Sequence, residues 1–328
     1  MLCVLPWFRF NALRLYGIAP RRNFAITFGF MNPKALLRSL TPSFLIKAWQ
    51  RIKRQQKRKQ LLQWQKEGKI LSQAKLLADF RKMGIVEGDS LMIHSSMRSL
   101  GFLEKGPQTF IDAALEAVGK NGNLLMPSSP IAQLQLLYAQ ANPLFDVRET
   151  PSAMGAISEA FRKYKDVLCS PHPTEAVCAI GPNAHWLTEG HYLQPTPYNP
   201  SSPFARLMQL EGKILYCGVT LDNAGTHLHT LEDVVDFPHP VYYEKSFNLR
   251  VRDVTGKEYI HKTRVHNPEW SRKRLCDGLI PYFEEKQVLT RHKLGRADCL
   301  LLMAKPMLDA MVEGFHSKGI TMYAPEGK

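Results

Sequence analysis

"DSLMIHSSMRSLGFLEKGPQTFIDAALEAVGKNGNLLMPSS", residues 89–129, is the stretch of sequence that decides the fold. Residues 90–96 and 123–129 are short apolar runs, which are typical of buried strands. Between them, residues 106–119 have the pattern of a helix that ends at Gly119. A strand, a helix and a second strand in this order predict a parallel β–α–β unit.

The alternation of helices and strands continues on both sides of this unit. Upstream, residues 72–84 predict a helix with Ser72 as its N-cap and Gly84 at its end. Downstream, residues 241–264 alternate as two antiparallel strands around the turn DVTGK. The other expected strands are 174–181 and 213–219, and the other expected helices are 152–164, 203–212, 226–235, 268–286 and 304–317. The pattern predicts an α/β fold, a layered α/β/α domain with a mixed sheet.

The formal charge of +14 belongs to one end of the chain. Residues 1–66 hold fourteen of the 43 Lys and Arg and no acid, so the remainder has 29 basic and 29 acidic residues. We therefore expect a basic N-terminal extension, 1–66, and a neutral globular domain, 67–328. A neutral domain does not have the broad basic surface of a nucleic-acid-binding protein, so a nucleic-acid partner is not expected.

Residues 43–66 predict a basic amphipathic helix. Such a helix suits an anionic membrane surface or an acidic polymer, and it equally suits a solvated helix packed on the domain or on a partner. The first thirty residues are rich in Arg and aromatics, which is compatible with an organelle transit peptide or with a working chain that begins near Met31. No apolar run approaches the roughly 18 to 20 residues of a membrane-spanning helix.

The six cysteines never form a C-x-x-C pair, and several lie in apolar, strand-like runs. This pattern favours buried free thiols in a reducing compartment over disulfides or a zinc site. We expect a cytoplasmic protein, with the basic extension at the inner face of the membrane as a further hypothesis.

Ligands of α/β sheets bind beyond the carboxyl ends of the strands. Three polar clusters follow expected strands there, and they are predicted to meet at one cleft. Their members are His94, Ser95, Ser96 and Arg98; Ser170 and His172; and Asp222, Asn223, Thr226, His229 and Glu232.

His172 is the first candidate for a general base, because an imidazole titrates near neutrality and the flanking prolines restrict its backbone. His229 and Glu232 are three residues apart and share a helix face. Glu232 is therefore a candidate to orient His172. Alternatively, His229 and Glu232 only cap the helix or form a salt bridge with each other. His227 and His229 form an H-x-H, but without a third ligand at convincing spacing no metal is expected. Nucleotide-binding loops and a G-x-S-x-G elbow are absent from the sequence.

The chain resembles the aminoglycoside 3-N-acetyltransferase family, the antibiotic N-acetyltransferases whose fold differs from that of the GNAT enzymes. Five segments carry the resemblance in order over roughly 75–300: the stretch around 88–128, SAMGAISEAFRK, SPHPTEAVCAIGPNA, SPFARLMQLEGKILYCGV and THLHTLED. The resemblance implies direct acetyl transfer from acetyl-CoA to a primary amine, usually of an amino sugar. Two positions depart from the family pattern, namely Lys105 in an expected double glycine and Cys169 in place of an Arg.

The resemblance also implies roles for individual residues. The H-S-S segment at His94, Ser95 and Ser96 lines the coenzyme A channel, and Arg98, Met126 and Ser170 are assigned to the same cofactor site. His172 is implied as the base, Glu232 as the leading and Asp222 as the second candidate for its carboxylate partner, and His229 completes the H-x-x-E element. Backbone amides near Ser95 or Met126 are candidates to stabilise the oxyanion.

Two functions follow as hypotheses. The first is an acetyl-CoA-dependent N-acetyltransferase acting on an aminoglycoside or on another amino sugar, such as one of a surface polysaccharide. The second is a membrane- or polyanion-binding protein whose transferase-like body is inactive.

Overall fold

The computed structural model describes residues 51–52, 55–56, 59, 62–64, 66–67, 70–131, 134–192 and 195–324. Contacts divide the chain into two units, 1–60 and 61–328. The predicted boundary between residues 66 and 67 stays a prediction, and the first thirty residues lie outside the described part. Of the helix expected over 43–66, residues 43–50 also lie outside it, and the described residues from 51 to 66 are helical. No helix in the described ranges is long and apolar enough to cross a bilayer.

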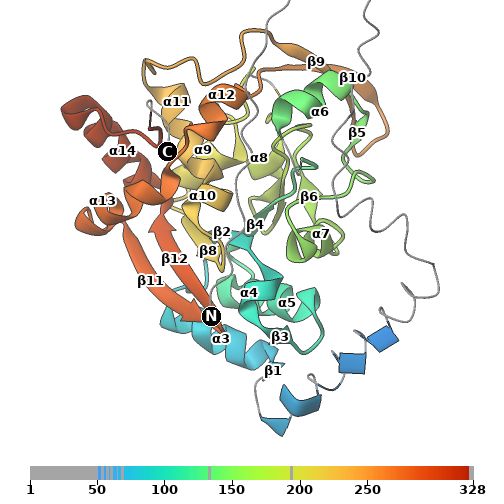
Figure 1. Ribbon diagram of the computed structural model, residues 1–328. Coiled ribbons are helices and arrows are strands. Elements are labelled where there is room, and N and C mark those ends of the chain that lie inside the picture. The colour runs from blue at the N-terminus through green and yellow to red at the C-terminus, as the bar shows by residue number, and fades with distance from the viewer. Residues whose placement is uncertain are drawn as a thin grey trace, which may run out of the picture. The chain divides into compact units, whose positions relative to one another are not determined.

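A seven-stranded mixed sheet forms the centre of the unit 61–328 (Figure 1). The β–α–β prediction is confirmed, because the strands β2 (Ser90–Ser95) and β4 (Asn123–Pro127) pair in parallel, and the helix α5 (Pro107–Val118) between them ends at Gly119 with φ of 65°. Strand β8 (Lys213–Cys217) pairs in parallel with β2 on its other side. The order is β11-β12-β8-β2-β4-β7-β6, with β6 at Leu168–Cys169, β7 at Val177–Ile180, β11 at Leu289–Leu294 and β12 at Ala297–Met303.

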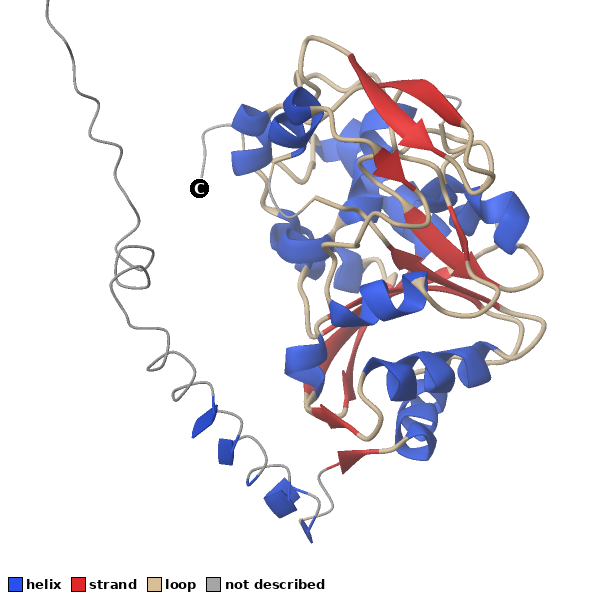
Figure 2. Cartoon of the chain, turned by 90° about the vertical axis from the view of Figure 1, so that its right-hand side faces the viewer, coloured by secondary structure: helices blue, strands red, loops and turns tan. Residues whose placement is uncertain are grey.

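Two apolar cores lie on opposite faces of this sheet, which confirms the layered α/β/α architecture. Along β2, Leu91 and Ile93 belong to one core and Met92 to the other, because successive side chains of a strand point to opposite faces. Helices α3 (Gln73–Lys82), α5 and α7 (Ala156–Arg162) pack into the first core, and α8 (Ala184–Thr188), α9 (Pro203–Gln209), α13 (Ile280–Glu285) and α14 (Ala304–Lys318) pack into the second. Figure 2 shows helices on both sides of the strands. Ser72 caps α3, as predicted, by accepting a hydrogen bond from the N–H of Lys75.

The hairpin expected over 241–264 is present but belongs to a second sheet. Strands β9 (Phe247–Arg252) and β10 (Glu258–Thr263) are antiparallel, and β5 (Phe145–Asp146) extends them to three strands. A third, two-stranded sheet pairs β1 (Ile70–Leu71) with β3 (Phe102–Leu103). The short helices α4 (Met97–Leu100) and α6 (Gln135–Ala141) complete this part of the chain.

The prediction of a single helix over 268–286 is wrong. The structure has α12 (Pro268–Arg272), the 3₁₀ helix η2 (Cys276–Leu279) and α13 instead. The helix is interrupted because the backbone of residues 274–275 is used elsewhere: the N–H of Leu275 donates to the carbonyl of Met322 (2.8 Å), and Arg274 forms a β-bridge with Tyr323. The hairpin of β11 and β12 was not predicted.

The expectation of free cysteines is wrong for one pair. Cys169 and Cys178 are register partners on β6 and β7, and a disulfide joins them. Antiparallel neighbours bring two such side chains together although nine residues separate them in sequence. Cys217, Cys276 and Cys299 are buried and free, as predicted, and Cys3 lies outside the described residues.

Candidate active site

A cleft of about 190 Å³ opens beside the segment that follows β8. That segment consists of α10 (Leu221–Ala224), η1 (Thr226–His229) and α11 (Thr230–Val234). Of the three predicted clusters, only the third lines this cleft, through Asp222, Asn223, Thr226 and His229. The other polar and charged lining residues include Ser129, Gln135, Glu175, Tyr198, His266, Ser271 and Arg274.

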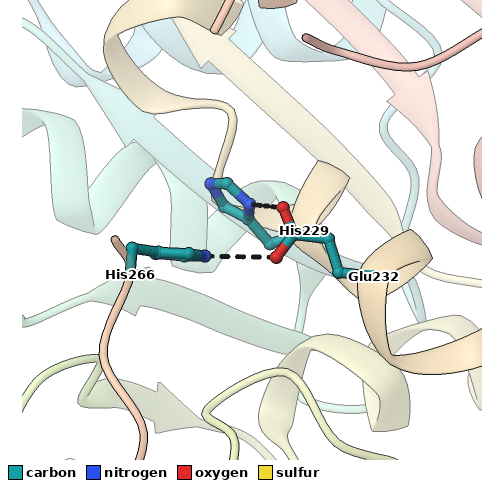
Figure 3. A group of neighbouring side chains, drawn as sticks. All are labelled: His229, Glu232 and His266. Carbon is teal, nitrogen blue, oxygen red and sulfur yellow. Dashed lines mark hydrogen bonds and ion pairs between the residues drawn. The ribbon is translucent and has the colours of Figure 1, made fainter. Parts of the chain in front are cut away.

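Glu232 lies buried beside His229 and also contacts His266 (Figure 3) and Tyr323. Its Oε1 is 2.7 Å from Nδ1 of His229, which confirms that the two side chains share a face. Its Oε2 is 3.2 Å from Nε2 of His266, and the hydroxyl of Tyr323 donates to Oε1 at 2.5 Å. Both oxygens of one carboxylate are therefore satisfied by two imidazoles and a phenol.

The charges of this network favour an ionised Glu232 beside neutral imidazoles. Burial would raise the pKa of Glu232, but its interactions with His229 and His266, which include a hydrogen bond from each ring, hold that pKa below its usual range. Burial lowers the pKa of His229 in spite of the carboxylate beside it, and lowers the pKa of His266 to about 3. A carboxylate only accepts hydrogen bonds, so Nδ1 of neutral His229 carries the proton and its Nε2 is left with a lone pair.

His229, Glu232 and His266 also form a group whose ligand atoms all lie within 4.8 Å of one another. Two imidazoles and a carboxylate are a donor set that a divalent metal uses. His266 is the third ligand that the sequence spacing did not reveal. In the structure the ligand atoms of the group are joined to one another by hydrogen bonds, and the expectation of no metal stays a prediction.

The predicted pairing of His172 with Glu232 is wrong. His172 lies in the loop after β6, where its Nδ1 accepts hydrogen bonds from the N–H groups of Thr174 (3.4 Å) and Glu175 (3.2 Å). Its ring packs against His191 and His261, with centroids 4.4 and 4.8 Å apart. Burial and these two rings hold the pKa of His172 well below its usual value. None of these described contacts of His172 involves Glu232, whose oxygens pair with His229, His266 and Tyr323 instead.

The other predicted site residues are placed as follows. Ser170 is buried, with its hydroxyl 2.8 Å from Nδ1 of His191, and it accepts a hydrogen bond from the N–H of Val177. Asp222 lines the cleft, and its Oδ1 accepts a hydrogen bond from the N–H of Asp277 (3.2 Å). Met126 is buried in the apolar core on β4, opposite Cys178.

The first cluster lies at the carboxyl end of β2. His94 is buried, stacks on Tyr216 of β8 with centroids 4.9 Å apart, and has a pKa that burial lowers to about 3. Ser96 precedes α4, and its hydroxyl accepts from that of Ser99 at 3.1 Å. Ser95 is partly buried at the strand end, and Arg98 is exposed. The assignment of this cluster, Met126 and Ser170 to coenzyme A stays a prediction.

Four residues of the site had not been singled out in the sequence. Glu175, three positions after His172, lines the cleft and accepts a hydrogen bond from Gln135 (2.5 Å). Burial raises the pKa of Glu175 to about 7. His266, Arg274 and Tyr323 come from segments more than thirty residues beyond Glu232, and no local spacing connects them with it.

The comparisons with known proteins agree with this architecture. Residues 92–316 match the family model of the aminoglycoside 3-N-acetyltransferases. Aminoglycoside N(3)-acetyltransferase VIII of Streptomyces fradiae is 29% identical over 254 residues, which cover 71% of this chain and 85% of that protein. Aminoglycoside N(3)-acetyltransferase III of Pseudomonas aeruginosa is 28% identical over 270 residues, 75% of this chain and 93% of that protein.

Solved structures give the same result. The enzyme AAC-VIa bound to sisomicin has a TM-score of 0.65 and 29% identity, covering 76% of this chain and 98% of that one. AAC-IIIb in a binary complex with CoASH has a TM-score of 0.66 at 24% identity, over 78% of this chain and all of that one, and shows the fold alone. The chain therefore has the fold of these acyltransferases rather than that of the GNAT enzymes, and it belongs to the aminoglycoside 3-N-acetyltransferase family.

Proposed function

We propose that the chain transfers the acetyl group of acetyl-CoA to a primary amine of an aminoglycoside or another amino sugar. The observation that carries the proposal is the pairing of His229, on the wall of the cleft, with the buried carboxylate of Glu232. Family membership and the relatives named for aminoglycoside N(3)-acetylation support the reaction class. The neighbour bound to sisomicin supports an aminoglycoside or a similar amino sugar as the acceptor.

His229, rather than His172, is the base in this proposal. An alkyl ammonium has a pKa of about 10, so it must lose a proton before or as it attacks the thioester. The lone pair on Nε2 of His229 takes that proton, and the ionised Glu232 stabilises the imidazolium that forms. His172, buried against two other rings, has a structural role that keeps Glu175 at the cleft.

The amine nitrogen attacks the thioester carbon, the new carbon–nitrogen bond forms, and the carbon–sulfur bond breaks. The sulfur leaves as a thiolate and receives the proton that His229 removed from the nitrogen. The second proton that the nitrogen loses on going from ammonium to amide is released to water. Holding amine and thioester together in the cleft supplies a further part of the acceleration.

The test is the release of free thiol from acetyl-CoA with a panel of aminoglycosides and simple amino sugars. Thiol release that depends on an amine, with an N-acetylated product of the expected mass, is the expected result. Failure of every amine to accelerate thiol release would overturn the proposal and favour the inactive, polyanion-binding alternative.

We also propose that the basic extension, 1–66, binds an anionic membrane surface. Its fourteen Lys and Arg without an acid are the supporting observation. Co-sedimentation of the full chain and of residues 67–328 with phosphatidylserine vesicles tests it. Salt-sensitive binding of the full chain alone is expected, and equal binding of both would refute the idea.

A further inference from the structure

Both acidic and basic residues line the cleft. Among the described residues that line it, Glu175 and Asp222 are the acidic ones and Arg274 is the basic one. Glu175 already accepts a hydrogen bond from Gln135, and Asp222 accepts one from the backbone of Asp277. The third carboxylate nearby, Glu232, is taken up by His229, His266 and Tyr323.

Arg274 is the basic residue among the described residues that line the cleft. It follows α12, and its backbone bridge to Tyr323 fixes where its side chain begins. Its Nε and Nη2 atoms are buried and have no hydrogen-bond partner in the described part of the chain, while the guanidinium as a whole interacts with the hydroxyl of Tyr323 and with the charge of Glu232. Arg274 lines the same cleft as His229 and acts electrostatically on both His229 and Glu175.

A buried guanidinium with unused donors is costly, because it has lost water without gaining a replacement. The group that best compensates it is a carboxylate or a phosphate, whose oxygens accept two parallel N–H bonds from the planar guanidinium. An acceptor with several ammonium groups would instead place like charge beside Arg274 in a partly dry cleft, where repulsion is poorly screened.

We infer that the acceptor is a primary amine that also carries one carboxylate or phosphate, with the anionic group held by Arg274 and the amine at His229. This inference rests on the proposed transferase function and narrows its substrate class. The acceptor of this chain would then differ in charge from polycationic ligands such as sisomicin, which is bound to one of its structural neighbours.

The matched probes are glucosamine and 2-amino-2-deoxyglucuronic acid, which differ only in a hydroxymethyl or carboxylate group, with glucosamine 6-phosphate and sisomicin beside them. The full chain is expected to acetylate an acidic probe with kcat/KM at least about tenfold above that for glucosamine and for sisomicin. Arg274→Gln should abolish this preference. Arg272→Gln removes the same charge from an exposed position of the same segment and should retain it.

The ratio between acceptors is the readout, because a partly misfolded variant lowers both rates equally. If the KM for acetyl-CoA rises in Arg274→Gln while the preference among acceptors stays, the guanidinium holds the donor's phosphates and the inference is overturned. A wild-type preference for glucosamine or sisomicin also overturns it but leaves the transferase function intact. If no amine is acetylated, the proposed transferase function fails. Calorimetric titration of the four probes then tests whether the cleft selects an anionic group. Equal binding of all four contradicts the inference, and tighter binding of the acidic probes supports it.

Discussion

The carboxylate of Glu232 lies 2.7 Å from Nδ1 of His229 and 3.2 Å from Nε2 of His266, so one buried acid orients two imidazoles. Each neutral ring has its proton on the nitrogen that faces the acid, and the other nitrogen of His229, which lines the cleft, remains an acceptor. An imidazole oriented in this way by a carboxylate is the usual arrangement of a general base.

Replacing His229, the proposed base, should abolish most of the activity. For His229→Ala we expect kcat to fall about a hundredfold to ten-thousandfold, because general-base catalysis contributes that much. Thiol release measures kcat, and calorimetric titration with CoA should show that the donor still binds. The matched control is His316→Ala, an exposed histidine on α14, which should retain full activity. Retained activity in His229→Ala would mean that another group removes the proton.

Removing the charge of Glu232 should shift the pH dependence of the reaction. The carboxylate raises the pKa of His229 against the effect of burial, so Glu232→Gln lowers that pKa. The base is active when it is neutral, above its pKa, and the acid limb of kcat/KM therefore moves to lower pH. We also expect kcat to fall about tenfold to a hundredfold, because the imidazolium loses its counter-ion. An acid limb at an unchanged pH would contradict the assigned pairing.

The sequence predicted those features of the site that depend on local geometry. Residues 90–127 encode the β–α–β unit in one stretch, and the three-residue spacing of His229 and Glu232 places them on one face. His266 and Tyr323 lie 34 and 91 residues from Glu232, and only tertiary packing brings them to it. The sequence did not indicate a role for Arg274, because the residues around it have a helical pattern. In the structure, residues 274–275 pair with the C-terminal segment and interrupt that helix.

Buried histidines should make the protein unstable in acid. Burial lowers the pKa of His94, His191 and His266 to about 3 and that of His261 to about 4, whereas the unfolded chain binds these protons near 6.5. The unfolded state therefore binds more protons between those values, and the free energy of unfolding falls as the pH falls from about 6.5 to about 3. Burial raises the pKa of Glu175 and of Asp233, which act in the opposite sense, but the buried histidines with lowered pKa values outnumber them.

Urea unfolding at pH 7.5 and at pH 5.5 measures this effect, and we expect the midpoint to be clearly lower at pH 5.5. In His191→Asn the midpoints should lie closer together, because one of the four groups is gone while an amide still reaches Ser170 or the carbonyl of Pro197. A wild-type midpoint that does not change between the two pH values would refute the assignment of these rings as buried and neutral.

The disulfide between Cys169 and Cys178 should stabilise the edge of the sheet beside the loop of His172. Closing a loop of nine residues restricts the unfolded chain, which corresponds to about 2–3 kcal/mol of folding free energy. We expect dithiothreitol to lower the urea midpoint of the wild type accordingly. The double variant Cys169→Ser with Cys178→Ser should start at that lower midpoint and not respond to the reductant. Cys276→Ser, which removes a buried free thiol, should keep the response, so a response in the double variant would place the reducible bond elsewhere.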